Sequence, residues 1–331
     1  AMIIVGLLLG YRYFHKANTK VKKAITKEQG ENYSSSVKFG KPFEERWKSE
    51  IKIKGPKIAY QDLKKEYKNY KSPAQHVAAH LMGELLYDAL GMEAIAICDS
   101  SFQYGCYHGV FISASVDKGA DIASQLNTIC LSSDLWVPAC QHGIGHGLVE
   151  YYGNSKTGLL KALVKCDELV GNTAIAGCAD GALMEYEFPS SDDPDDIRPQ
   201  IREMVSNNPH EICNIVSGDL SRRSCYFSMP QWWFLTFKDG YKHVGQICET
   251  VKSDKEKEAC FIGIGGDVVL RNNFDKERAM SVCNTMPNED SRASCLHGAY
   301  WIITSLSPKT ENSSSLCNVL NDDRKTECLA I

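Results

Sequence analysis

The chain has 331 residues, 43% hydrophobic and 24% charged, which is enough to bury a sizeable core. Its formal net charge is −4, and it contains no Walker-type, dinucleotide-binding or G-x-S-x-G motif. These features argue against a general nucleic-acid binder, so we expect no nucleic-acid partner. The function has to be inferred from the distribution of cysteine and histidine.

The first segment, residues 1–15, is predicted to be a remnant of a signal peptide or signal anchor. It begins with an apolar run (MIIVGLLL at 2–9) and ends in GYRYF. As a helix, this segment spans only about 20 Å, less than the ~30 Å core of a bilayer. The basic residues that follow favour the cytoplasmic side, whereas the cysteines favour the outside, and we follow the cysteines. An ordinary leading helix is the alternative.

The next segment, residues 16–72, is rich in Lys, Glu, Ser and Tyr and has no cysteine. We interpret it as a polar tether, flexible around residues 30–36 and helical around residues 60–70. Pro73 then opens a repeat domain that covers residues 73–331.

The fourteen cysteines form seven consecutive pairs, whose members are separated by 8 to 12 positions. Zinc and iron–sulfur sites favour C-x₂₋₄-C knuckles, which do not occur, so we predict seven sequential disulfides. Disulfides persist outside the cytosol, and the protein is therefore expected to be secreted or anchored to the outer face of the cell membrane. The predicted pairs are Cys98 with Cys106, Cys130 with Cys140, Cys166 with Cys178, Cys213 with Cys225, Cys248 with Cys260, Cys283 with Cys295 and Cys317 with Cys328.

The first cysteines of the pairs recur about every 35 residues, which is the period of a two-helix repeat. The sequence therefore predicts an all-α fold, a right-handed α-solenoid of about seven two-helix repeats, each stapled by one disulfide. By its period alone the region resembles the tetratricopeptide and HEAT-like α-hairpin repeats. The tetratricopeptide Trp/Leu-Gly/Tyr signature is absent, so the resemblance implies a fold and no function.

A small residue stands three positions after the second cysteine of six pairs. Glycine inside a helix costs about 1 kcal/mol relative to alanine, so its recurrence suggests a packing reason. We interpret the missing side chain as letting the two stapled helices approach closely. The residues are Gly109, Gly143, Gly181, Ser228, Gly263 and Gly298.

Histidines occupy a fixed position in several repeats. His108, His142 and His297 all lie two residues after a second cysteine, a position that Asp180 and Phe227 take in other repeats. On a helix, this position and the next ones four and eight residues later form one stripe that points away from the stapled partner helix. Glu185 and Glu187 continue the helix beyond Asp180 and are expected to border the same groove.

The pattern Gln-His-x₃-His-x₃-Glu occurs at residues 75–84 and again at residues 141–150, two repeat lengths further on. Histidines at i and i+4 on one helix face can bind one metal ion. A glutamate one turn further on can complete the ligand set, orient a histidine or act as a base. The predicted ligands are His76, His80, His108, His142, His146, Glu84 and Glu150.

The metal prediction leaves several alternatives open. The histidines could form a hydrogen-bonded polar core, one metal site, two sites or a bis-histidine haem site. Imidazole and carboxylate ligands suit zinc, iron or copper, and also nickel or manganese. By analogy with HEAT-like di-iron hydroxylases, a two-metal site would activate water or dioxygen. The His-x₃-His pattern differs from the His-Glu dipeptides of those enzymes, so catalytic residues and enzyme activity stay undecided.

Two function classes follow from these patterns. The first is an extracytoplasmic, membrane-tethered helical repeat protein with a transition-metal site on its first three repeats, with or without catalytic activity. The second is a scaffold without catalytic activity that binds a protein or peptide in the solenoid groove or near Trp232, where aromatic residues cluster.

Overall fold

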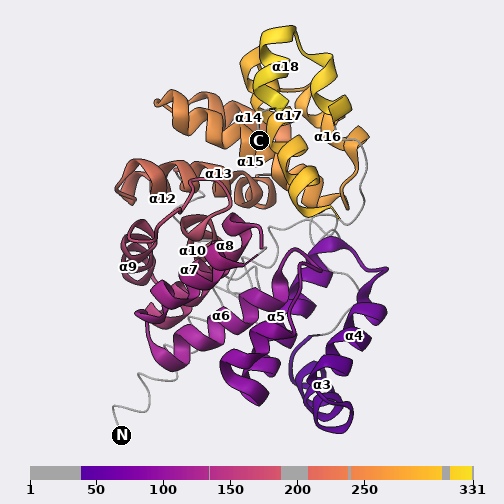
Figure 1. Ribbon diagram of the computed structural model, residues 1–331. Coiled ribbons are helices and arrows are strands. Elements are labelled where there is room, and N and C mark those ends of the chain that lie inside the picture. Colours follow the sequence, from indigo (N-terminus) through magenta and orange to yellow (C-terminus); the bar gives the residue numbers. More distant parts are fainter. Residues whose placement is uncertain (1–38, 134, 188–207, 238–239, 308–313, 330–331) are drawn as a thin grey trace, which may run out of the picture.

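The computed structural model describes residues 39–133, 135–187, 208–237, 240–307 and 314–329, and these are helical throughout, with no strand among them (Figure 1). The predicted signal or anchor segment at residues 1–15 and the flexible stretch at 30–36 lie outside the described residues. None of the helices in the described part of the chain combines the length and apolar character that crossing a bilayer requires.

Seven cysteine pairs join a first helical element to a second one, as the sequence predicts. The helix α5 (Ser72–Leu90), which carries no cysteine, precedes them. The first elements are η1 (Gly91–Ala96), α7 (Ile122–Ser132), α9 (Lys156–Asp167), α12 (Glu211–Ile215), α14 (Gly240–Glu249), α16 (Lys276–Cys283) and η3 (Ser314–Val319). The second elements are α6 (Gly105–Lys118), α8 (Val137–Tyr152), α10 (Cys178–Glu187), α13 (Asp219–Thr236), α15 (Asp254–Arg271), α17 (Glu289–Leu306) and α18 (Asp322–Leu329).

The seven predicted pairs all lie at disulfide distance, and together they account for all fourteen cysteines. The Cα atoms of each pair are between 5.4 and 5.7 Å apart, within the range that disulfides require. Each bond staples one hairpin and none joins distant parts, and the disulfides indicate an oxidising environment. The bonds join Cys98 to Cys106, Cys130 to Cys140, Cys166 to Cys178, Cys213 to Cys225, Cys248 to Cys260, Cys283 to Cys295 and Cys317 to Cys328.

The second helices form an inner row in which α5, α6, α8, α10, α13, α15 and α17 pack against one another in chain order. The row bends back on itself, because α15 also contacts α5. At this junction the backbone N–H of Ser72 donates to Asn273 Oδ1 at 2.8 Å, and the rings of Trp136 and Trp301 meet at 4.9 Å. Figure 1 shows the chain turning from α5 and α6 through α8 and α13 and returning towards its start at α15 and α17.

The recurring glycines pack between successive repeats, and not between stapled helices as the sequence suggested. A Cβ atom added to Gly109 of α6 would lie 1.9 Å from His80 O of α5, and one added to Gly181 of α10 would lie 1.9 Å from His142 O of α8. The glycines remove side chains where the inner helices touch backbone to backbone. The interpretation was wrong because a disulfide already sets the spacing of the stapled helices, whereas neighbouring repeats have no bond between them.

This contact predicts that adding one methyl group at Gly109 lowers the stability of the fold substantially. In Gly109→Ala the new Cβ meets a backbone carbonyl, which cannot turn away, so α5 and α6 must separate and draw His80 away from His108. We expect a loss of about 1–3 kcal/mol of unfolding free energy, despite the better helix propensity of alanine. Urea unfolding measures it. Gly245→Ala in α14 is the matched control, because its Cβ would meet only the flexible side chain of Met286, at 3.1 Å, and Pro287. Equal effects of the two changes would contradict the prediction.

The segment expected to be a tether contributes two helices to the folded core. They are α3 (Lys41–Lys54) and α4 (Pro56–Tyr67), the latter overlapping the helix predicted around residues 60–70. Trp47 and Tyr60 are almost fully buried in these helices and belong to the main hydrophobic core. The high charge of this segment concealed aromatic residues at helical spacing, which place one apolar face of each helix against the rest of the protein.

The aromatic cluster at Trp232 is part of the core. Trp232 and Trp233 are 2% and 0% exposed, and the indole N–H of Trp233 donates to Pro209 O at 3.1 Å. These rings stabilise α13 against its neighbours and are not displayed on the surface.

Candidate metal centre

Three neighbouring inner helices bring five histidines together. His76 and His80 lie one turn apart on α5, His108 lies in the first turn of α6, and His142 and His146 lie one turn apart on α8. The glycine contacts set the spacing of these helices, since Gly109 abuts the backbone of His80 and a Cβ at Gly143 would lie 2.8 Å from His108 Cδ2. The predicted ligand histidines therefore converge.

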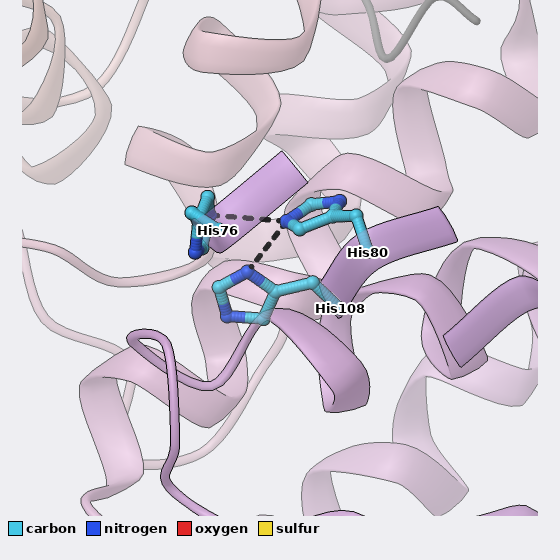
Figure 2. Close-up of side chains that lie close together, drawn as sticks. All are labelled: His76, His80 and His108. Atoms are coloured by element: carbon cyan, nitrogen blue, oxygen red, sulfur yellow. Dashed lines mark hydrogen bonds between the residues drawn. The ribbon is translucent and has the colours of Figure 1, made fainter. Parts of the chain in front are cut away.

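The first triad consists of His76, His80 and His108 (Figure 2). The Nε2 atom of His80 lies 3.1 Å from His76 Nε2 and 3.0 Å from His108 Nδ1. Nitrogens bound to one tetrahedral zinc ion at 2.0–2.1 Å are separated by about 3–3.5 Å. The observed spacing is therefore that of a ligand set around one ion. It also leaves no space for a porphyrin between these rings, so a bis-histidine haem does not fit here.

Two backbone carbonyls set the tautomers of this triad. His76 Nδ1 lies 2.8 Å from Phe102 O, and His108 Nε2 lies 2.9 Å from Ala139 O. A carbonyl only accepts, so each of these nitrogens carries a hydrogen and donates it. The other nitrogens of His76 and His108, which face His80, consequently present lone pairs. A hydrogen on His80 Nε2 can be donated to only one of the two nitrogens that this atom contacts, His76 Nε2 or His108 Nδ1. A cation between the rings would instead accept a lone pair from each of the three histidines.

The second triad consists of His108, His142 and His146, so His108 belongs to both triads. In each triad, one ligand atom from each residue lies within 4.8 Å of the others. The rings of His80 and His146 have centroids 5.2 Å apart, and those of His108 and His146 5.5 Å apart. The five imidazoles thus form one continuous cluster with room for one ion or for two neighbouring ions.

Carboxylates of α10 orient the histidines of α8. His142 Nδ1 lies 3.0 Å from Asp180 Oδ2, and His146 Nδ1 lies 2.7 Å from Glu185 Oε2. An Nδ1–H that donates to a carboxylate leaves Nε2 with its lone pair, which is the arrangement typical of metal-bound histidine. His146 Nε2 is buried and has no hydrogen-bond partner among the described residues. Such an orphaned acceptor is unfavourable unless a bound ion or solvent molecule satisfies it.

The predicted glutamates lie outside both triads. Glu84 is partly buried on α5, and Glu150 is exposed near the end of α8. Partial desolvation and the negative charge of Glu185 raise the pKa of Glu150. The carboxylates that contact the histidines come from the next repeat instead, because Asp180 occupies the same register position as His142 on the neighbouring helix. The sequence analysis placed Asp180 at the register of these histidines and Glu185 beside the same groove, and it assigned neither of them as a histidine partner.

Burial favours the neutral form of four histidines of the cluster. Burial is the main cause that lowers the pKa of His76 to about 4 and the pKa values of His80, His108 and His146 well below their ordinary value. For His80, the positive charge that His76 and His108 would carry when protonated lowers the pKa further. Neutral imidazole is the form that binds metal, so no proton has to leave these groups at neutral pH.

These pKa shifts predict the pH dependence of the metal-free fold. Histidine in the unfolded chain has a pKa of about 6.5, so between pH 6.5 and 5 the unfolded chain binds more protons than the folded one. The unfolding free energy should be constant above pH 6.5 and should fall as the pH drops towards 5, before carboxylates titrate. Urea unfolding in the presence of a chelator measures this. The slope should be smaller in His80→Asn, and a flat profile in the original protein would contradict the prediction.

The cluster faces a central cavity of about 210 Å³. All seven helices of the inner row, from α5 to α17, contribute to its lining, including all five histidines and Asp180. The remaining walls are mainly apolar, and Asp267 and Arg271 of α15 add a charged pair. A ligand in the cavity therefore has direct access to the imidazole nitrogens.

No family model, curated protein or solved structure matches this chain. The histidine centre is thus interpreted from its own geometry.

Proposed function

We propose that the protein is an extracytoplasmic metalloprotein that binds a transition-metal ion at the five-histidine cluster, and that the bound metal faces the central cavity as the reactive group of a metalloenzyme. The observation that carries this proposal is that His80 Nε2 lies 3.0–3.1 Å from one nitrogen of His76 and one of His108, both of which are held as lone-pair donors by backbone carbonyls. In a purely hydrogen-bonded core each acceptor would face a donor, whereas here His80 Nε2 can donate its one hydrogen to only one of the two acceptors that it faces.

The residues divide into ligands and orienting groups. His76, His80 and His108 would hold one ion, and His142 and His146 would complete its coordination or hold a second ion beside it. Asp180 and Glu185 keep the last two rings in the correct tautomer. Zinc, iron and copper all suit such a nitrogen-rich set. When bound, the metal supplies Lewis acidity, and with iron or copper also redox chemistry, towards a molecule in the cavity.

The wider architecture belongs to the same proposal. We propose that the stapled hairpins form a right-handed α-solenoid whose inner row encloses the cavity, and that the N-terminal apolar segment tethers it to the outer face of the cell membrane. The disulfides support the location, and the packing of the inner row in chain order supports the solenoid. The scaffold alternative, with a protein or peptide bound in the groove, stays a prediction.

Two measurements test the proposed function: the metal content of the protein and the metal affinity of a variant that lacks one orienting carboxylate. Purified, disulfide-intact protein should contain one or two transition-metal ions per chain, measured by mass spectrometry of the elements after dialysis. In Glu185→Gln the carboxylate that accepts from His146 is lost, and we expect metal affinity to fall about 10–100-fold in a competition titration with a chelator. The control is His210→Ala, because His210 contacts Thr250 Oγ1 at 2.8 Å and lies outside the cavity lining. Protein that neither retains nor takes up any metal would overturn the proposal.

A further inference from the structure

The cavity has two chemically different halves, and residues at the same positions of successive repeats line both of them. The positions two and six residues after the second cysteine carry His142 and His146 on α8. On α10 the same positions carry Asp180 and Met184, and on α13 they carry Phe227 and Gln231. All six side chains line the cavity. The same two positions therefore supply candidate metal ligands on one side of the cavity and thioether, aromatic and amide groups on the other.

The half opposite the histidines is mainly apolar. Met184, Phe227, Leu270 and Leu306 line it and are only partly buried, although each belongs to an inner helix. Gly266 also lines the cavity, and a Cβ added there would meet apolar side-chain atoms of Ile302, at 3.2 Å, and of Phe227. Large apolar side chains that line a cavity next to reactive groups are the usual environment of a small organic ligand.

The charged side chains of the cavity lining already make polar contacts with other residues of the protein. Arg271 Nη2 lies 2.9 Å from Asp267 Oδ1, and the Tyr241 hydroxyl donates to Asp267 Oδ2 at 2.7 Å. Asp180 accepts from His142. An anion placed among the apolar side chains would meet one cationic side chain of the lining, Arg271, which is already paired with Asp267. Burying a charge without a partner of its own is strongly unfavourable.

We infer that the cavity binds an uncharged, mainly apolar small molecule, with one polar atom directed at the histidine centre. The apolar body lies against Met184, Phe227 and Leu270, and the polar atom reaches the metal or the imidazoles. This inference rests on the proposed function in one respect, because the bound molecule is the substrate only where the cluster holds a metal. The affinity for the apolar body comes from the chain itself and is present in the metal-free protein.

The test uses two probes with the same naphthalene body, 2-naphthol and 2-naphthoate, of which only the second is charged at neutral pH. Isothermal titration of metal-free protein, prepared with a chelator, should show one 2-naphthol per chain and a negative heat-capacity change. The affinity of 2-naphthoate for this protein should be lower by about tenfold or more, because the one cationic side chain of the lining, Arg271, is already paired with Asp267. Equal affinities, or no saturable binding of 2-naphthol to folded protein, would overturn the inference.

Variants locate the binding. Leu270→Trp on α15 and Leu306→Trp on α17 fill the cavity from two helices that carry none of the five histidines, and each should lower 2-naphthol affinity about tenfold or more. The matched control is Val164→Trp on α9, which is 59% exposed on the outside. An equal loss in the control, or no loss in both filling variants, would overturn the inference.

The metal content of the same samples separates the two proposals. Both filling variants should bind metal as the original protein does. Metal binding without 2-naphthol binding would refute only the apolar site, whereas 2-naphthol binding to a protein that takes up no metal would refute only the proposed metal function.

Discussion

His108→Ala is expected to abolish high-affinity metal binding, because His108 belongs to both histidine triads. It is the only one of the five histidines supplied by α6, so no neighbour one turn away on the same helix can replace it. We expect metal affinity to fall by at least about 100-fold, more than the loss of an orienting carboxylate would cause. The measurement is metal content after dialysis, together with a chelator competition titration.

The control for this variant separates ligand loss from misfolding. Removing the imidazole also leaves Ala139 O without its donor, and this should lower the unfolding free energy by about 1–3 kcal/mol. His108→Gln, whose amide can still donate, should restore part of this stability and none of the metal affinity. A variant that keeps the disulfides and the fold and still binds metal normally would show that the triads are not the site.

Reduction of the disulfides is expected to unfold the whole repeat domain. Each bond closes a loop of roughly 9–13 residues and contributes about 3 kcal/mol on the chain-entropy model, or on the order of 20 kcal/mol for all seven. The total stability of a folded domain is about 5–15 kcal/mol. Circular dichroism should therefore show loss of helix when the protein is reduced, and metal should be released with it.

Peptide mapping under non-reducing conditions provides the control for this experiment. It should recover the seven sequential linkages in the starting material and alkylated cysteines after reduction. A reduced chain that still unfolds cooperatively at the original denaturant concentration would contradict the role given to the staples.

The repeat architecture could be predicted from the sequence because the cysteines recur at a regular interval along the chain. The even number of cysteines and their pairwise spacing predicted the seven linkages. The interval between the first cysteines of successive pairs predicted the all-helical fold. The same reasoning found the five histidines, since their positions relative to the second cysteine place them on one face of successive helices. These predictions succeed because they depend on register within a helix and on order along the chain.

Other features depend on contacts between repeats, which periodicity does not encode. The glycines were assigned to the wrong helix pair, because spacing shows that a close approach occurs and not which surfaces meet. Glu84 and Glu150 were chosen because they continue a helical stripe, whereas the orienting carboxylates, Asp180 and Glu185, come from the helix beside it. The helix α3 and the burial of α3 and α4 were not predicted, because a few aromatic residues outweigh many charged ones once a face is buried.

The bend that returns α15 to α5 bears on how the histidine centre is held. Every disulfide joins two elements adjacent along the chain, and α5 has none, so α5, α6 and α8 are held to one another by packing and hydrogen bonds, with no covalent bond between them. An ion bound by His76, His80, His108 and His146 would add coordinate bonds between successive repeats, which no disulfide joins. The seven disulfides would then hold each repeat together internally, and the metal would hold neighbouring repeats together. Metal binding should therefore slow hydrogen exchange first in α5, the helix that has no disulfide.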